Sequence, residues 1–416
     1  MKLKINKKAF DSNLASLIFL LLFPGFFFYS YAVARAAVYA LPGGWFGVFT
    51  SLSFVLLIPI VLMRLPSSKG LVLKFLFVFF LLLCFIGAWA VSHYLMGAPV
   101  QKSADALKGS IQILVFGFVF FFTGFFFSPR KWFGFALYIS FFGMLFLILL
   151  HFDPSRMMFY AKEQFIMKKG VADYQGFARS FALTAIMLLA ISRRLYAQAA
   201  IIVLSLFALY LLLARSEFFG FIFVVLIAGW VILLRSSLSV KVLFILLFIL
   251  FMSSFFWLPG SEFSNRQFEV LKLTESTSVA KRIEFLQEGW NQIKKSAVFG
   301  DYAGQLREGG FGSYIHNGLS AWRQFGILGF GMYFGLSMLS LFIATREVIF
   351  RRNKEFYWKA ALYMNLYTFL LMLVAKSVFG NLAPLAWGFT MNAVIQGKKH
   401  FFPGFYKGRR WLAKTY

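Results

Sequence analysis

Apolar runs of about twenty residues recur along most of this chain, and they restrict its fold more than any other feature. A membrane-spanning helix needs roughly 20 predominantly apolar residues. With 60% hydrophobic and 14% charged residues, the chain has more apolar surface than a soluble protein of this length buries. The sequence therefore predicts an all-α, polytopic transmembrane bundle of about twelve spans. The predicted spans lie near 14–33, 44–63, 71–95, 109–127, 132–151, 176–192, 197–213, 217–234, 241–257, 325–344, 357–375 and 378–396.

The distribution of charge predicts the orientation of these spans. With the N-terminus inside, the inner segments carry a net charge of +21 and the outer segments +6, which together give the chain's +27. Cytoplasmic loops carry the excess of Lys and Arg, so both termini are predicted to be cytoplasmic. The positive charge then reflects topology and contact with anionic lipid rather than nucleic-acid binding. Very short turns after 213 and 375 also allow ten or eleven spans.

The spans divide the chain into four predicted regions. The first apolar run follows four lysines and resembles a signal peptide, but many further spans follow it and no clear small-residue cleavage site is present, so it is interpreted as a retained helix. The regions are an N-terminal bundle of about nine spans at 1–257, an outer loop at 258–324, C-terminal helices at 325–396 and a basic cytoplasmic tail at 397–416.

The long outer loop is the predicted location of any water-requiring chemistry, because charged groups are costly at the bilayer centre. Within it, Ile283, Leu286, Trp290 and Ile293 recur at three- and four-residue spacing. This pattern predicts an amphipathic helix near 279–295 that lies on the membrane face or on the bundle.

Several other chemistries lack the residues that they require. Cys84 is the single cysteine, so no intramolecular disulfide and no Cys-rich metal site can form. The chain has no Gly-rich loop ending in Lys-Ser or Lys-Thr, as ATP-driven transport would require. The first outer loop, at 34–43, contains Arg35 and no acidic residue, which argues against a metal-dependent glycosyltransferase with paired carboxylates. The 59 phenylalanines are interpreted as packing and lipid-facing surface.

An ordered set of short motifs gives the chain a family resemblance over about residues 200–345. Ala214-Arg215-Ser216 lies at an outer span end, and the long loop contains Arg282 and Trp290 in a helix. A Gly-rich stretch, His316-Asn317-Gly318-Leu319 and Gly326-Ile327-Leu328-Gly329 follow. In this order and topology the chain resembles the superfamily of O-antigen ligases and O-antigen polymerases, although an asparagine-containing motif of many relatives is missing near Arg179.

The resemblance implies an activity and a substrate class. Members of this superfamily transfer a glycan from an undecaprenyl diphosphate carrier to an acceptor on the periplasmic side of the bacterial inner membrane, without a metal or other cofactor. Ligases use the lipid A core sugar as acceptor, and polymerases use another lipid-linked repeat unit. By this resemblance Arg215 and Arg282 hold the diphosphate, and His316 assists attack by the acceptor.

The residue types suit such a reaction, and each also has a plainer interpretation. Arginine forms planar, permanently charged contacts to phosphate, and imidazole accepts a proton near neutral pH. Alternatively, Arg215 snorkels to the interface, Arg282 belongs to a charged helix face, and His316 precedes a helix that Asn317 caps. Arg179, at the outer start of the sixth span, is a further candidate for substrate binding together with Asn317.

The sequence thus predicts an O-antigen ligase-type glycosyltransferase whose partners are a lipid-linked glycan donor, a lipid A core or lipid-linked acceptor, and membrane lipid. An O-antigen polymerase is the alternative within the same enzyme class. A flippase or exporter of lipid-linked oligosaccharides is the alternative from another class.

Overall fold

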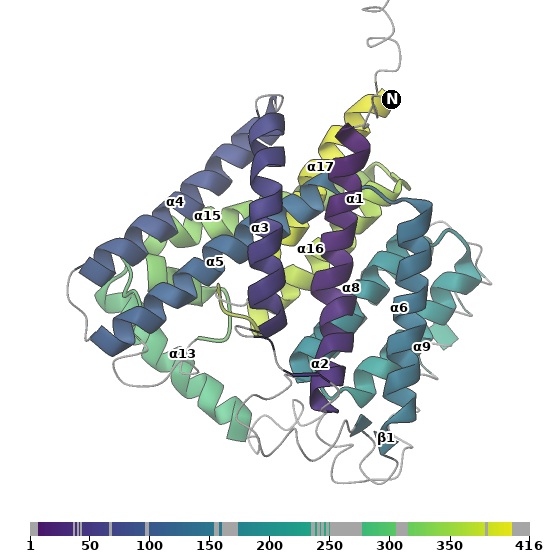
Figure 1. Cartoon of the computed structure of the whole chain (residues 1–416), viewed down its shortest axis with the longest axis horizontal. Helices are drawn as coiled ribbons and strands as arrows, with labels where there is room; N and C mark the ends of the chain where they lie inside the picture. Colours follow the sequence, from purple (N-terminus) through teal and green to yellow (C-terminus); the bar gives the residue numbers. More distant parts are fainter. Residues whose placement is uncertain are drawn as a thin grey trace, which may run out of the picture.

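The computed structural model is a bundle of helices (Figure 1). It describes residues 7–35, 38–39, 41, 44–65, 69–95, 100–153, 158–159, 174–233, 238, 242, 245–246, 249, 277–304, 315–378 and 382–401. Outside this part of the chain lie most of the predicted span 241–257, much of the predicted outer loop and the basic tail from 402. The helices are α1 (Lys7–Leu20), η1 (Leu21–Gly25), α2 (Phe26–Ala34), α3 (Gly44–Arg64), α4 (Leu71–Leu95), α5 (Val100–Phe126), α6 (Lys131–Leu150), α8 (Tyr174–Ile191), α9 (Leu195–Leu211), α10 (Arg215–Leu233), α13 (Thr277–Lys295), α15 (Leu319–Thr345), η3 (Arg346–Phe350), α16 (Phe356–Val374) and α17 (Ala383–Phe401).

The helical, multi-pass membrane class predicted from the sequence is confirmed. Among the described residues, seven helices are long and apolar enough to cross a membrane. They are Ala9–Ala34, Gly44–Arg64, Leu71–Leu95, Leu107–Phe126, Lys131–Leu150, Tyr174–Ile191 and Leu319–Phe350. The shorter α9 is also apolar. The predicted total of about twelve spans stays a prediction.

Helices α16 and α17 fall outside that set because polar residues lower their hydropathy, and both lie inside the bundle. Both carry buried polar side chains, including Asn365, Thr390 and Asn392. Asn365 Nδ2 donates to Thr390 Oγ1 at 2.8 Å, which links the two helices. A helix that packs in the centre of a bundle can carry such groups because neighbouring helices satisfy them.

Two glycines set the crossing of α5 and α17 at the centre of the bundle. A Cβ atom at Gly388 would lie 2.0 Å from the carbonyl oxygen of Phe121, and one at Gly124 would lie 2.5 Å from the carbonyl oxygen of Leu385. Nearby, Asn392 Nδ2 donates to the carbonyl oxygens of Gly124 at 3.1 Å and Phe127 at 2.5 Å. Small residues let the two backbones approach, and the Asn392 amide donates to carbonyl oxygens at the end of α5.

Phenylalanine fills the interior around this crossing. Phe79 of α4 stacks on Phe121 of α5 with ring centroids 4.3 Å apart, and Trp387 of α17 meets the Phe79 ring edge-on at 6.2 Å. All three residues are almost completely buried. Stacked and edge-on ring pairs of this kind favour packing beyond the area that they bury, as expected for the Phe-rich sequence.

The two ends of the bundle differ in the helices and strands that lie there. The start of α1 and the end of α17 lie together at one end, and α13 lies at the opposite end (Figure 1). Near the first end, Asp11 and Arg64 form an ion pair at 2.7 Å. Strands β1 (Phe152–Asp153) and β2 (Met158–Phe159) pair antiparallel near the second end. We call this second end the α13 end.

The predicted boundary between outer loop and span is displaced in the structure. Helix α15 begins at Leu319, six residues before the predicted start of the span at 325, and it contains a break at Gly326, where φ is +67° and ψ is −172°. The turn that precedes Gly326 therefore belongs to the α13 end, and the long helix continues from Ile327. Apolar periodicity does not reveal this break, because helical sequence flanks it on both sides.

Candidate functional site

Helices α8, α10 and α15 are among those that begin at the α13 end of the bundle, and α16 ends beside them. Helices α8, α10 and α15 start at Tyr174, Arg215 and Leu319, and α16 ends at Val374. Contacts described below join the starts of α8, α10 and α15 to the end of α16. Helix N-termini carry partial positive charge and unpaired N–H groups, so this cluster of helix ends favours an anion.

Arg215 lies at the first position of α10, after a tight turn from α9. Leu213 in this turn has a φ of +55°, a conformation that side chains other than glycine adopt rarely. The amide of Phe218 donates to the carbonyl oxygen of Ala214 at 3.0 Å, which starts the helix. The turn therefore fixes Arg215, which is half-buried, at the rim of the bundle.

Glu217 lies two residues further on and is completely buried. Its Oε1 atom is 3.0 Å from Lys376 Nζ and 3.9 Å from Arg179 Nε. Ser216 Oγ donates to its other oxygen. Lys376 Nζ also donates to Gln175 Oε1 at 2.7 Å. This ionic cluster, which comprises Arg179, Glu217 and Lys376, joins α8, α10 and the segment that follows α16.

The charges of the ionic cluster are not balanced within the described residues. Two cations meet one carboxylate oxygen, and the side chains of Arg179 and Lys376 are 18% and 10% exposed while that of Glu217 is not exposed at all. Neither Arg179 Nε nor Glu217 Oε1 makes a hydrogen bond to a described residue. The carboxylate therefore lies beneath two cations that reach toward solvent.

Tyr367 of α16 borders the ionic cluster from within the bundle. A Cβ atom at Gly220, one turn after Glu217, would lie 3.0 Å from the Tyr367 ring, and the ring is fully buried. The Tyr367 hydroxyl has no hydrogen-bond partner among the described residues. Gly220 lets this ring lie against α10, because any side chain at that position would press on it.

His316 and Asn317 immediately precede α15 at the same end. The His316 ring stacks on Phe285 of α13 with centroids 6.2 Å apart and an interplanar angle of 12°. Asn317 Oδ1 accepts from the amide of Leu319 at 3.0 Å, which supports the turn before α15, while the N-cap residue of that helix is Gly318. The amide of Gly318 donates to the carbonyl oxygen of Met372 at 2.6 Å, four residues before Lys376.

Arg282 lies on α13, the helix predicted near 279–295. Helix α13 packs closely at Gly289, where a Cβ atom would lie 2.3 Å from Ile315 and 3.6 Å from Arg323 of α15, and its Ile293 is 2% exposed. Arg282 is on the exposed side and makes no hydrogen bond or ion pair to a described residue. The structure does not bring Arg282 to Arg215 through any described contact, so the predicted pair of arginines stays a prediction.

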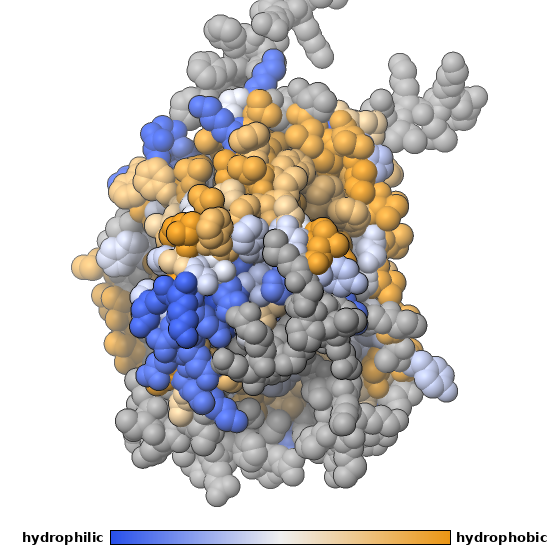
Figure 2. All heavy atoms as spheres, turned by 90° about the vertical axis from the view of Figure 1, so that its left-hand side faces the viewer, coloured by the Kyte–Doolittle hydropathy of each residue, from blue (hydrophilic) through white to orange (hydrophobic). Residues whose placement is uncertain are grey.

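Most of the predicted apolar stripe of α13 faces away from the bundle. Ile283, Leu286 and Trp290 are 49%, 36% and 43% exposed, and only Ile293 is buried. Trp290 still meets Trp322 of α15 edge-on, with centroids 6.2 Å apart. Figure 2 shows hydrophilic residues gathered below an apolar band, toward the end where α13 lies. The stripe is thus available to the membrane surface.

The segment after α13 fills the break in α15. A Cβ atom at Gly326 would lie 2.0 Å from the carbonyl oxygen of Val298, and Gly300, with a φ of +76°, lies against the Gly326 amide. The amide of Asp301 donates to the carbonyl oxygen of Arg323 at 2.5 Å, and that of Ala303 donates to Gln324 Oε1 at 2.8 Å. Gly300 and Gly326 are thus needed for close backbone contact rather than for substrate.

Tyr302 fixes the end of this segment to α4 and α5. Its hydroxyl pairs with Ser110 Oγ, and its ring meets His93 edge-on with centroids 5.0 Å apart. Burial raises the pKa of Tyr302, so the hydroxyl stays protonated at neutral pH. His93 therefore packs against the segment that follows α13.

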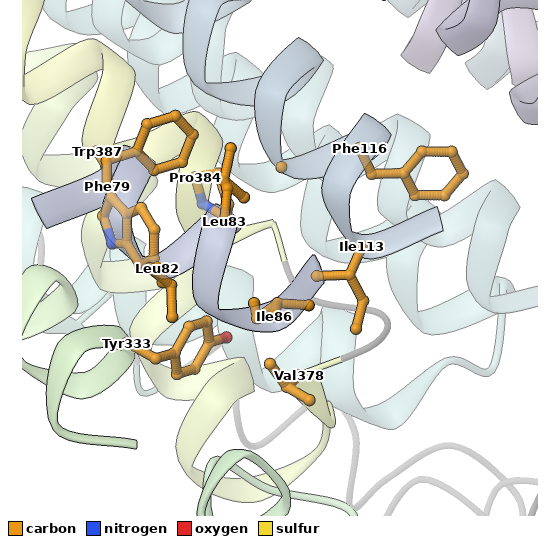
Figure 3. A pocket seen from close by; sticks show the side chains of 11 residues that line it. Phe79, Leu82, Leu83, Ile86, Ile113, Phe116, Tyr333, Val378, Pro384 and Trp387 are labelled. Atoms are coloured by element: carbon orange, nitrogen blue, oxygen red, sulfur yellow. The ribbon is translucent and has the colours of Figure 1, made fainter. Parts of the chain in front are cut away.

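An apolar crevice ends beside the ionic cluster. It lies between α4, α5, α15 and α17, and Figure 3 shows side chains from these helices around it, with Val378 at its lower edge. The amide of Val378 donates to Ser320 Oγ at 2.8 Å, in the first turn of α15. The crevice thus ends two residues from Lys376. Its lining is Phe79, Leu82, Leu83, Ile86, Ile113, Phe116, Gly117, Tyr333, Val378, Pro384 and Trp387.

Sequence reasoning missed Glu217 and Lys376 as site residues. Glu217 is the first residue of a predicted span, and Lys376 lies in a predicted two-residue turn. A charged residue at such a boundary does not by itself indicate a site. The sequence feature that could have identified them is that each interrupts a long apolar stretch at the outer end of a span. Within the residues that the structure describes, no group of three or more His, Cys, Asp or Glu side chains could hold a metal ion. Comparison of the chain with protein-family models and with curated proteins finds no match.

Proposed function

We propose that the protein is a metal-independent membrane glycosyltransferase of the O-antigen ligase type. Its donor is a glycan on undecaprenyl diphosphate, and its acceptor is the lipid A core sugar. The reaction takes place at the periplasmic face of the bacterial inner membrane, which corresponds to the α13 end. The proposal includes about twelve spans and cytoplasmic termini.

One observation carries this proposal: positive charge gathers where three helices start, next to a histidine. Arg179, Arg215 and Lys376 lie at or near these helix ends, and the Gly318–Met372 hydrogen bond ties the segment bearing His316 to the same place. Transfer from a lipid diphosphate releases an anionic leaving group. Fixed cations and helix N-termini stabilise the negative charge that develops on it.

The crevice next to the ionic cluster has a cavity volume of about 30 Å³, too small to enclose a hydrocarbon chain, so it supports an amphiphilic donor only by marking the apolar side of the site. A lipid-linked glycan has a hydrocarbon chain, a diphosphate and a polar sugar chain, and these need an apolar groove, cations and an aqueous face in that order. The apolar crevice ends at Val378, and Lys376 lies two residues away. His316, which is half-buried at the rim, would then accept the proton of the acceptor hydroxyl as it attacks the sugar carbon bonded to the diphosphate.

The test is transfer in vitro by the purified full-length protein. It is given a lipid-linked glycan with either a lipid A core or a second lipid-linked repeat unit as acceptor. Product on the lipid A core supports the ligase, and product only on the lipid-linked acceptor supports the polymerase. Absence of both products, together with movement of the donor across vesicle membranes, supports the flippase and contradicts the proposal.

A deletion strain gives an independent assay. If the protein is a ligase, carrier-linked polymer should accumulate without attachment to lipopolysaccharide. If it is a polymerase, lipopolysaccharide should instead carry the core with one repeat unit. Unchanged lipopolysaccharide banding would contradict both activities.

A further inference from the structure

Glu217 is a buried carboxylate for which the proposed chemistry gives no direct role. It is completely buried at the start of α10, and its two nearest cations are Lys376 Nζ at 3.0 Å and Arg179 Nε at 3.9 Å. A buried charge is costly unless it is paired. One cation would suffice to balance it, yet two converge on the same oxygen atom.

The second cation gives the ionic cluster an excess positive charge. Both cations are partly exposed, whereas the carboxylate lies beneath them. Arg179 Nε has no hydrogen-bond partner among the described residues. Two partly exposed cations that share one carboxylate suit an oxyanion bound on the exposed side, because such a ligand accepts several charge-assisted hydrogen bonds at once.

Glu217 also connects the parts of the site that the proposed reaction uses. It lies two residues from Arg215, in the first turn of the same helix. Lys376 follows α16 directly, and the end of α16 holds Gly318, two residues from His316, through the Met372 carbonyl oxygen. A displacement of the carboxylate would therefore affect both the donor side and the acceptor side.

We propose that Glu217 is a positioning residue, whose buried carboxylate holds Arg179 and Lys376 at the α13 end so that both cations face one phosphate-type oxyanion. That the oxyanion is the diphosphate of the lipid-linked donor rests on the proposed function. The positioning of the two cations does not, since it follows from the ion pairs themselves. Glu217 itself touches no substrate.

The experiment compares the parent protein with Glu217→Gln, which keeps the shape of the side chain and removes its charge. Asp11→Asn is the matched control, because Asp11 is also buried in an ion pair, with Arg64, at the opposite end of the bundle. The full-length protein in lipid nanodiscs is first acetylated near neutral pH, and mass spectrometry measures the rate at Lys376. Binding of undecaprenyl diphosphate and of undecaprenol is then measured on the same preparations.

Glu217→Gln should acetylate several-fold faster at Lys376 than the parent, because the ammonium group loses the charge that stabilises it. Its affinity for undecaprenyl diphosphate should fall by about tenfold or more, with retention of undecaprenol unchanged. Asp11→Asn should match the parent in both measurements. Unchanged acetylation of Lys376, or an affinity within twofold of the parent, would overturn the inference.

Two further measurements separate a misfolded variant and a wrong donor from a wrong role for Glu217. If Glu217→Gln does not fold, Gln175→Met removes the 2.7 Å acceptor of Lys376 Nζ and keeps the carboxylate, and it should give smaller changes in the same direction. No change at Lys376 in that variant overturns the inference. If the parent itself does not bind undecaprenyl diphosphate, the proposed donor is wrong, and the acetylation rates alone decide the role of Glu217.

Discussion

The amide of Gly318 donates to the carbonyl oxygen of Met372 at 2.6 Å, which fixes the start of α15 to the end of α16. This bond places His316 and Asn317 in a rigid connection rather than at the tip of a loop. His316 is further held by its stack on Phe285 of α13. A group that must meet an acceptor hydroxyl at a defined place needs such support.

His316→Ala should reduce glycan transfer by about 100- to 10,000-fold, the usual effect of removing a general base. A base must be neutral, so transfer by the parent should decline in acid, within the range of about pH 5–8 over which histidine side chains change charge. The measurement is turnover of a purified lipid-linked donor across this range. His93→Ala is the control and should retain turnover. A His316→Ala variant with near-normal turnover, or with the parent's pH dependence, would contradict a role as base.

Arg215→Ala and Arg282→Ala should each lower the rate of transfer by about 10- to 150-fold, as expected for loss of one charge-assisted hydrogen bond to phosphate. Lysine at either position should restore only part of the rate, because it lacks the planar fork of donors. Arg351→Ala is the control, since Arg351 is an exposed residue paired with Glu347 within η3 and its following turn. Full activity of both alanine variants at normal expression would exclude the predicted pair of arginines.

Gly326→Ala should destabilise the protein by about 1–3 kcal/mol, since an unfavourable φ combines with overpacking. The new methyl group would meet the Val298 carbonyl oxygen and displace the segment that fills the break in α15. Gly331→Ala, in the same helix, has open space for a Cβ atom, and it should be neutral or gain up to about 1 kcal/mol in helix propensity. Thermal unfolding in detergent compares the two. Equal melting temperatures would show that the break does not require glycine.

The stability of the protein should decrease as the pH falls below about 6.5, and His151 should contribute to this decrease. Burial, and then the nearby charge of Arg35, lower the pKa of His151, while Tyr31 Oη lies 2.6 Å from its Nε2 atom. The unfolded chain therefore takes up a proton at a higher pH than the folded chain, so acid favours unfolding.

The measurement for His151 is the melting temperature of the parent and of His151→Gln at acidic and at neutral pH. The difference between the two conditions should be smaller for His151→Gln, since glutamine does not titrate there. An identical loss of stability in parent and variant would assign the acid sensitivity to other groups.

The sequence predicted the class of fold and the ends of most helices because apolar length depends only on local composition. It placed residues 279–295 in a helix, which the structure has as α13, and Arg215 in a tight turn between two spans, where the structure has it at the first position of α10. Each follows from a local preference.

The features of the structure that the sequence did not predict depend on contacts between segments that are far apart in the chain. The pairing of Glu217 with Lys376 requires that α10 and the end of α16 lie side by side, which no spacing in the chain indicates. The same holds for Gly388. A side chain is excluded there only because the backbone of α5 packs against it. Asn365 and Asn392 lower the hydropathy of α16 and α17, and only the three-dimensional packing shows that these helices are central.

The crossing of α5 and α17 has a consequence for how the protein is made. Helix α5 leaves the ribosome long before α17, yet its crossing site at Gly124 fits the backbone at Gly388, and its terminal carbonyls accept from Asn392. Chains fold from their N-terminal part during synthesis. The interior of the bundle therefore stays incompletely packed in the membrane until residues 383–392 have been inserted. A substitution at Gly388 should thus act mainly on the yield of assembled protein, through quality control, and less on a molecule that has already matured.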